Sequence, residues 1–175
     1  MWDEQAIARR GETLAERALA VWPDFARRDG AADGEIPTEE EVQEDVKLLI
    51  AKVLDHFGGE RGRLGKGSRI FYQVGDGKVL NIKYSKRHSD YYWFGFHASL
   101  WEDIAKAGVT HVVFILLSDG FVAVPVAIMK EYIAEAGFSP KSDGTVRHYH
   151  VLISIDTKPE LFHHGKAGRI SLKPY

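Results

Sequence analysis

The stretch from Thr110 to Leu117, THVVFILL, constrains the fold of this chain more than any other. It is an almost continuous apolar run. Runs of this kind are typical of β-strands that are covered on both faces, because neither face offers polar side chains to water. The chain must therefore supply a layer of structure on each side of this strand.

Helical and strand patterns follow one another along the rest of the chain. The predicted helices span residues 4–20, 38–57, 100–107 and 127–136. The predicted strands span residues 69–74, 79–85, 91–97, 110–117, 121–126, 148–156 and 169–172. This order indicates an α/β fold with a mixed central β-sheet and flanking helices.

The length of 175 residues favours a single domain, 1–175. Within it we expect an N-terminal helix and linker over 1–36, a core over 37–137, and C-terminal strands over 138–175. No internal repeat is visible.

Local signals fix several element boundaries. Thr38 is a good N-cap, and Glu41 stands at the capping-box position three residues later. Gly75-Asp76-Gly77-Lys78 predicts a hairpin turn, because its glycines accept positive φ. Ser99 is predicted to cap the helix over 100–107.

Composition excludes several classes of protein. Cysteine is absent, which excludes disulfides, thiolate zinc sites and cysteine nucleophiles. No apolar run approaches the roughly 18 residues of a membrane span, and the N-terminus carries no apolar signal segment. Nucleotide-binding glycine loops, nucleophile elbows and HExxH motifs are also missing. We expect a soluble cytoplasmic protein that does not bind membranes.

Charged residues are unevenly distributed along the chain. Residues 1–60 carry seven Lys/Arg and fifteen Asp/Glu, whereas residues 61–175 carry sixteen and ten. Between Arg61 and Arg87 there are eight Lys/Arg against one acid, Asp76. Such asymmetry is expected when one surface meets a polyanion. The alternative is an acidic helix that packs beside a basic sheet.

The basic side chains form two groups that can contact phosphates, with Lys83 between them. The first group is spaced by glycines, which let backbone amides approach a phosphate closely. The predicted phosphate contacts are Arg61, Arg63, Lys66, Arg69, Lys83, Lys86, Arg87 and His88.

An aromatic run, Tyr91-Tyr92-Trp93-Phe94-Gly95-Phe96, follows the second basic group. Alternation along a strand places Tyr91 and Trp93 on one face and Tyr92, Phe94 and Phe96 on the other. One set fills the core. We expect the other, Tyr91 with Trp93, to contact bases.

Histidines are frequent near the C-terminus. His148 and His150 are two residues apart on a predicted strand and so share a face, and His163 and His164 follow. Imidazoles bind zinc or copper, but no third ligand stands at a dependable spacing. We therefore predict no metal site here.

The segment from Val42 to about Ile133 resembles the core of the PD-(D/E)xK, or restriction-endonuclease-like, superfamily, and within it the resolvase-like branch. The resemblance is carried by GKGSRIFYQVGDGKVLNIKYS (65–85) and THVVFILLSDGFVAVPVAIMKEYI (110–133), and it covers roughly half of the chain. It implies an acidic helix, a basic loop, and a hairpin with Asp on its first strand and Glu-x-Lys on its second, followed by a helix and further strands.

The resemblance also implies where catalysis fails. Lys83 stands at the motif lysine, but Asn81 replaces the glutamate and Tyr72 replaces the aspartate. The observation that tests the resemblance is whether these three side chains meet at one exposed face beside the basic loop. If Asn81 is buried and Lys83 points elsewhere, the alignment fails. Mg²⁺ requires anionic oxygen ligands, which an amide and a phenol do not supply.

Three functions remain open. The first is a non-catalytic nucleic-acid-binding module, with DNA as the expected target, that needs no cofactor and serves a restriction, repair, defence or mobile-element system as a homodimer or in a larger complex. The second is an active Mg²⁺-dependent endonuclease that uses Lys83 with relocated carboxylates, namely Asp76 and Glu44 or Asp45. The third is a protein-interaction domain that binds a basic partner through the acidic helix 38–57.

Overall fold

The structure is a computed structural model, and it describes residues 39–65, 70–85, 87–88, 90–155, 158–165 and 168–172. The predicted helix 4–20 and the N-cap residue Thr38 lie outside these ranges. So do three of the predicted phosphate contacts, Lys66, Arg69 and Lys86.

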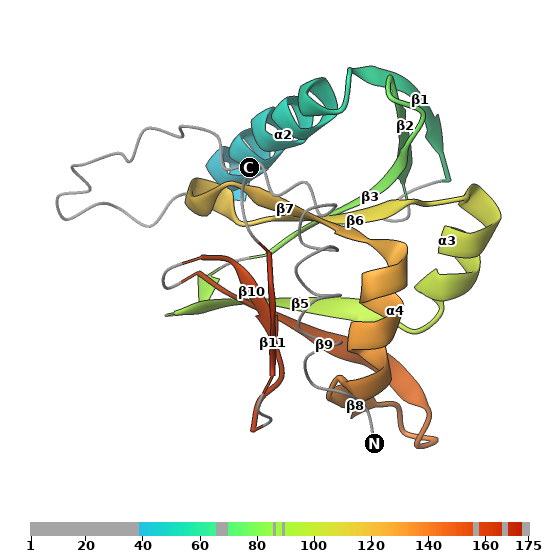
Figure 1. The fold of residues 1–175 in the computed structure, drawn as a ribbon, viewed down its shortest axis with the longest axis vertical. Helices are drawn as coiled ribbons and strands as arrows, with labels where there is room; N and C mark the ends of the chain where they lie inside the picture. Colours follow the sequence, from blue (N-terminus) through green and yellow to red (C-terminus); the bar gives the residue numbers. More distant parts are fainter. Residues whose placement is uncertain are drawn as a thin grey trace, which may run out of the picture.

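Five strands form a mixed sheet, here called the first sheet (Figure 1). Its order is β1-β2-β3-β6-β7, and β3 and β6 run parallel while all other neighbours are antiparallel. This confirms the predicted α/β class with a mixed sheet. The strands are β1 (Glu60–Leu64), β2 (Phe71–Val74), β3 (Val79–Tyr84), β6 (His111–Ile115) and β7 (Phe121–Pro125).

A second, wholly antiparallel sheet was not predicted. β3 is already paired with β2 and β6, so β5 cannot pair with it, and β5 pairs with β9 instead. Its order is β11-β10-β9-β5-β4, with β8 also paired to β9. The strands are β4 (Arg87–His88), β5 (Tyr91–His97), β8 (Phe138–Pro140), β9 (Val146–Ser154), β10 (Glu160–Phe162) and β11 (Arg169–Ser171).

Three helices complete the described part of the chain: α2 (Glu39–His56), α3 (Leu100–Ala107) and α4 (Val126–Glu135). A short 3-10 turn, η1 (Leu117–Asp119), joins β6 to β7. In Figure 1, α2 lies on one side of the first sheet, and the second sheet lies on the other side with α4 running alongside both sheets. None of these helices is long and apolar enough to cross a membrane.

The strand β6 is buried on both faces, as its sequence predicts. Val113 and Ile115 pack toward α2, in one cluster with Val53 and Phe57. The alternate side chains Val112 and Phe114 face the second sheet. That larger cluster also contains Tyr92, Phe94, Phe96, Val151 and Ile153 from the second sheet, and Ile104, Met129 and Tyr132 from α3 and α4.

Most local predictions over 39–137 are confirmed within two residues, including the β2–β3 hairpin. Gly75 of its turn is a position where only glycine fits, because a Cβ there would stand 2.1 Å from the carbonyl oxygen of Gly58. The predicted capping role of Ser99 is wrong, since Ser99 has α-helical backbone angles and its side chain makes no capping hydrogen bond. The short strands β1, β4, β8 and β10 were not predicted, and Arg61–Leu64 lie in an edge strand, not in a loop.

Tyr132 joins α4 to the second sheet. Its hydroxyl donates to the carbonyl oxygen of Phe162 at 2.7 Å and accepts from the backbone N–H of Leu152 at 3.1 Å. Burial raises the pKa of Tyr132 to about 12, so the hydroxyl stays protonated and able to donate.

We expect Tyr132→Phe to lower the free energy of unfolding by about 1–3 kcal/mol, because it leaves buried backbone groups without their partner. Urea denaturation of the full chain measures this loss. Tyr84→Phe is the matched control, since Tyr84 is 58% exposed and its substitution should leave the midpoint unchanged. Equal midpoints for both variants would show that the hydroxyl does not hold α4 to the sheet.

Candidate nucleic-acid interface

Asn81 and Lys83 share one face of β3, as their spacing predicts. That face is turned toward the second sheet, because Asn81 lies opposite Phe71 and Val112 of the core and Lys83 lies opposite Phe114. The ammonium of Lys83 stands 5.8 Å from the centre of the Phe96 ring. Asn81 is 1% exposed, so this pair is not an open surface.

Tyr72 does not join them, so Tyr72, Asn81 and Lys83 do not meet on one exposed face. Tyr72 lies opposite Leu80, whose side chain points to the α2 side of the sheet. The guanidinium of Arg63 covers its ring at 5.4 Å. Strand alternation therefore places Tyr72 on the opposite face from Asn81. The β2 residue that does face Asn81 is Phe71, which cannot bind a metal.

The amide oxygen of Asn81 is buried and has no hydrogen-bond partner among the described residues. An unpaired buried acceptor is unfavourable by about 1–3 kcal/mol. Asn81 is one of only two buried polar residues in this part of the chain. The motif position thus holds a neutral polar group in an apolar layer.

The carboxylates proposed as replacements lie elsewhere. Asp76 accepts a hydrogen bond from the backbone N–H of Lys78 at 3.1 Å and pairs with its ammonium. Burial acts to raise the pKa of Asp76, but these bonds and the charge of Lys78 outweigh it and lower the pKa. Asp76 lies before the first residue of β3, whereas Lys83 lies near the end of that strand. Four residues separate Val79 from Lys83, which is about 13 Å at ~3.3 Å per residue.

The acidic helix contributes nothing at this position either. Glu44 is exposed on α2 and pairs with Lys47 at 2.5 Å, and Asp45 is exposed beside it. α2 covers the opposite face of the first sheet from Lys83. Within the described ranges, no cluster of three or more His, Asp or Glu side chains is arranged to hold a metal ion.

The predicted phosphate contacts are divided between the two sheets. Arg61 is exposed on the edge strand β1, and Arg63 beside it pairs with Glu60 at 2.6 Å. Arg87 and His88 form β4, at an edge of the second sheet. These two residues therefore belong to a different sheet from Arg61 and Arg63.

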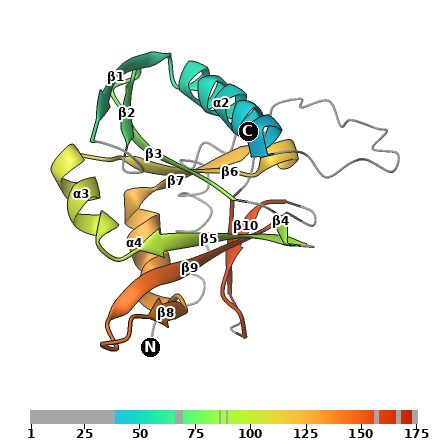
Figure 2. The same ribbon diagram turned by 180° about the vertical axis from the view of Figure 1, so that it is seen from behind.

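The alternation predicted for the aromatic run is confirmed. Tyr92, Phe94 and Phe96 are buried in the core, whereas Tyr91 and Trp93 are half-buried on the other face of β5. α4 lies in front of β9 in Figure 1 and behind it in Figure 2, so the helix covers the opposite side of the sheet.

Trp93 is the centre of this surface. Gly95, two residues along, leaves room for the indole, because a Cβ at Gly95 would stand 3.2 Å from the Trp93 ring. The rings of His148 and His150 flank the indole with centroids 5.5 and 5.7 Å away. His97 lies 5.9 Å from His148.

A second group of rings continues the same face. Tyr91 meets Phe162 and His164 edge-on, with centroids 5.8 and 5.5 Å away. The guanidinium of Arg169 covers Phe162 at 5.4 Å. Together these side chains form what we call the outer aromatic face: Tyr91, Trp93, His97, His148, His150, Phe162, His164 and Arg169.

Charge on the outer aromatic face depends on pH. Burial lowers the pKa of His148, and neighbouring positive charges lower it further; these belong to His150, His97 and Arg147. His148 is therefore neutral near pH 7 and gains charge only at lower pH. Lys158 and Arg169 both pair with Glu160, at 3.5 and 3.1 Å, which leaves one positive charge in excess.

Sequence reasoning found Tyr91 and Trp93 but missed their neighbours. It considered His148 and His150 as metal ligands, because the pairing of β9 with β5 is not visible in the sequence. The alternation of histidines over 148–150 was the one available signal that this face is not purely apolar.

No protein-family model, curated protein or solved structure matches the chain.

A separate titratable group lies at the start of β6. His111 is half-buried, 6.3 Å from the Phe57 ring, and its Nδ1 is 3.0 Å from the Thr110 hydroxyl. Burial lowers the pKa of His111, and the charge of Lys78 lowers it further against an opposing effect of Asp76.

This lowered pKa predicts a loss of stability in acid. The unfolded chain takes up a proton near pH 6.5, whereas folded His111 resists it, so stability is full above about 6.5 and falls as the pH drops below that value. His111→Gln should flatten this slope in urea denaturation at a series of pH values. An unchanged slope would mean that His111 is not responsible, and His164→Gln, at an exposed histidine, serves as the control.

Proposed function

We propose that the chain is a nucleic-acid-binding module with a restriction-endonuclease-like core that does not catalyse cleavage. The order α2-β1-β2-β3-β4-β5-α3-β6-β7 supports the core, because it contains the helix, hairpin, helix and strands that the resemblance implies, with β4 and β5 of the second sheet between β3 and α3. Asn81 at the position of the motif glutamate, with Phe71 opposite it, supports the loss of cleavage, because neither side chain supplies an anionic oxygen to a metal ion.

The outer aromatic face is the proposed binding surface. The observation that carries the proposal is the indole of Trp93, which lies across Gly95 on a face that core and helices leave uncovered among the described residues. Half-exposed aromatic rings on a sheet bind unpaired bases by stacking, at about 1–3 kcal/mol per base. This favours single-stranded over double-stranded targets.

Phosphates have partners at both edges of this surface. Arg169 is 53% exposed at one edge, and His88 lies opposite Tyr91 in the strand β4 at the other. Stacking in the middle and cations at the edges suit an extended single strand that crosses the sheet. We propose DNA as the target, and recognition within a restriction, repair or mobile-element system as the role.

Trp93→Ala should weaken binding of a labelled single-stranded oligonucleotide about tenfold, because one stacking contact is lost. Fluorescence anisotropy measures this. Tyr84→Ala removes an equally available aromatic ring from the first sheet and should have no effect. The wild-type affinity should fall steeply between about 50 and 200 mM salt, and Lys86→Ala with Arg87→Ala should reduce that slope.

Other results decide against parts of the proposal. Absence of binding to DNA would refute DNA as the target, and binding of RNA alone would reassign it. Equal affinity for duplex and single strands, unchanged by Trp93→Ala, would rule out stacking on the outer aromatic face.

The same protein should not cut nucleic acid. We expect no cleavage of plasmid, single-stranded or branched DNA in Mg²⁺ or Mn²⁺, because Asp76 and Glu44 do not reach Lys83. Gel electrophoresis of the products measures this. Cleavage that Lys83→Ala abolishes and Lys106→Ala preserves would establish an active nuclease in place of the binding module.

A further inference from the structure

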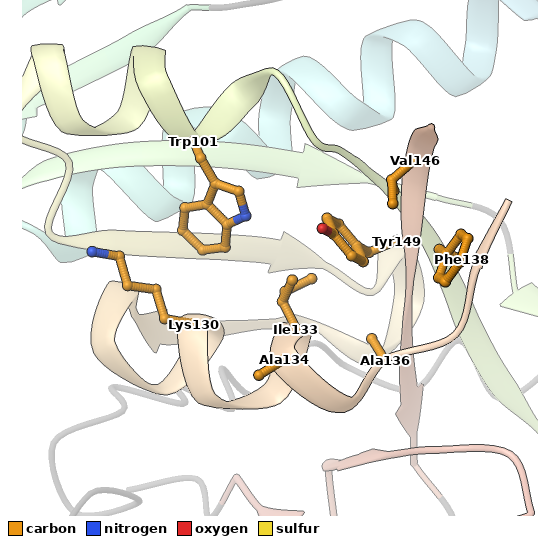
Figure 3. Close-up of a pocket in the computed structure, with 8 residues that line it drawn as sticks. All are labelled: Trp101, Lys130, Ile133, Ala134, Ala136, Phe138, Val146 and Tyr149. Atoms are coloured by element: carbon orange, nitrogen blue, oxygen red, sulfur yellow. The ribbon is translucent and has the colours of Figure 1, made fainter. Parts of the chain in front are cut away.

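A hollow of about 460 Å³ lies between α3, α4 and the strands β8 and β9 (Figure 3). It is separate from the outer aromatic face. One of its lining residues, Tyr149, lies opposite Phe96 and therefore on the core side of the second sheet, whereas Trp93 is on the other side. Its volume is within the range of about 300–1,000 Å³ that is typical of small-molecule sites.

The lining is mainly apolar and partly aromatic. Trp101 forms one end, where its ring packs on Phe96 with centroids 4.8 Å apart. Ile133 and Ala134 of α4 form the floor, and Phe138 forms the far end (Figure 3). Phe138 is 51% exposed, one of three large apolar side chains that are exposed in the described ranges. Such exposure marks a surface that gains from being covered.

Three hydrogen-bond donors border this apolar space. The indole nitrogen of Trp101 and the hydroxyl of Tyr149 point toward each other across the hollow, and Lys130 lies at the Trp101 end (Figure 3). None of the three groups has a hydrogen-bond or ion-pair partner among the described residues. No carboxylate lines the hollow.

We propose that this hollow binds a small organic anion: an apolar or aromatic body that rests on Ile133 and Phe138, ending in an acidic group that accepts from Trp101 and Tyr149. The exposed ammonium of Lys130, beyond the indole, attracts the negative charge. The chemistry of the lining favours both parts. Negative charge is favoured because a cation and two donors border the hollow and no carboxylate lines it, and an inorganic anion would leave the apolar floor in water.

Two fluorescent probes of similar shape test the proposal. Anilinonaphthalene sulfonate carries one negative charge, whereas N-phenylnaphthylamine is uncharged. The full-length protein should bind the charged probe more tightly, with enhanced and blue-shifted emission. Lys130→Met should weaken the charged probe about fivefold and leave the uncharged probe unchanged, because only the attraction of the ammonium for the negative charge is lost.

Three further variants locate the site. Tyr149→Phe should weaken the charged probe about tenfold through loss of a charge-assisted hydrogen bond. Ala134→Phe fills the hollow from an exposed helix position and should weaken both probes. Lys106→Met is the matched control, since Lys106 is an exposed lysine that pairs with Glu102 and does not line the hollow.

The possible contrary results are distinct. Failure of the wild type to bind either probe, or binding that Ala134→Phe leaves intact, overturns the site. Equal effects of Lys130→Met and Lys106→Met overturn the assignment of an anion. Trp93→Ala should not change binding of either probe, so the outcome is independent of nucleic-acid binding by the outer aromatic face.

Discussion

The burial of β6 on both faces is the constraint on which the rest of the structure depends. Val113 and Ile115 require a layer on one side, which α2 supplies, and Val112 and Phe114 require a layer on the other, which the second sheet supplies. Each such side chain contributes about 1.5–3 kcal/mol when it is removed from water. The strand thereby fixes a three-layer arrangement of helix, mixed sheet and antiparallel sheet (Figure 1).

This arrangement decides which surfaces are available for binding. The face of β3 that carries Asn81 and Lys83 is turned toward the second sheet, where Asn81 is buried opposite Phe71 and the ammonium of Lys83 lies against Phe96. The second sheet buries one of its faces against the first sheet. Its other face, with Trp93 at the centre, is left without cover from the described helices. The proposed function therefore uses the outer face of the second sheet and not the face of β3 that is turned toward it.

The sequence was sufficient to predict most helices and strands, but it did not show which strands pair with one another. Periodicity, turn glycines and the apolar run located the helices and strands over 39–137, because these signals act within a few residues. The second sheet depends on the pairing of β5 with β9, whose partners Trp93 and Leu152 are far apart in the chain. The sequence did not show that Phe71, and not Tyr72, lies on the face of Asn81, because one residue of register reverses the direction of a side chain. Trp93 was identified by alternation, but its contacts with His148 and His150 follow only from the pairing.

The central claim is that nucleic acid binds to the outer aromatic face and not to the basic edge of the first sheet. Amide and indole chemical shifts of the full chain, followed by NMR as a single-stranded DNA oligonucleotide is added, test this most directly. The account predicts that the shifts concentrate on β5, β9 and β10, including the Trp93 indole N–H, while those of β1 to β3 stay in place. Shifts that centre on Arg61, Arg63 and Lys83 and leave Trp93 unchanged would contradict it.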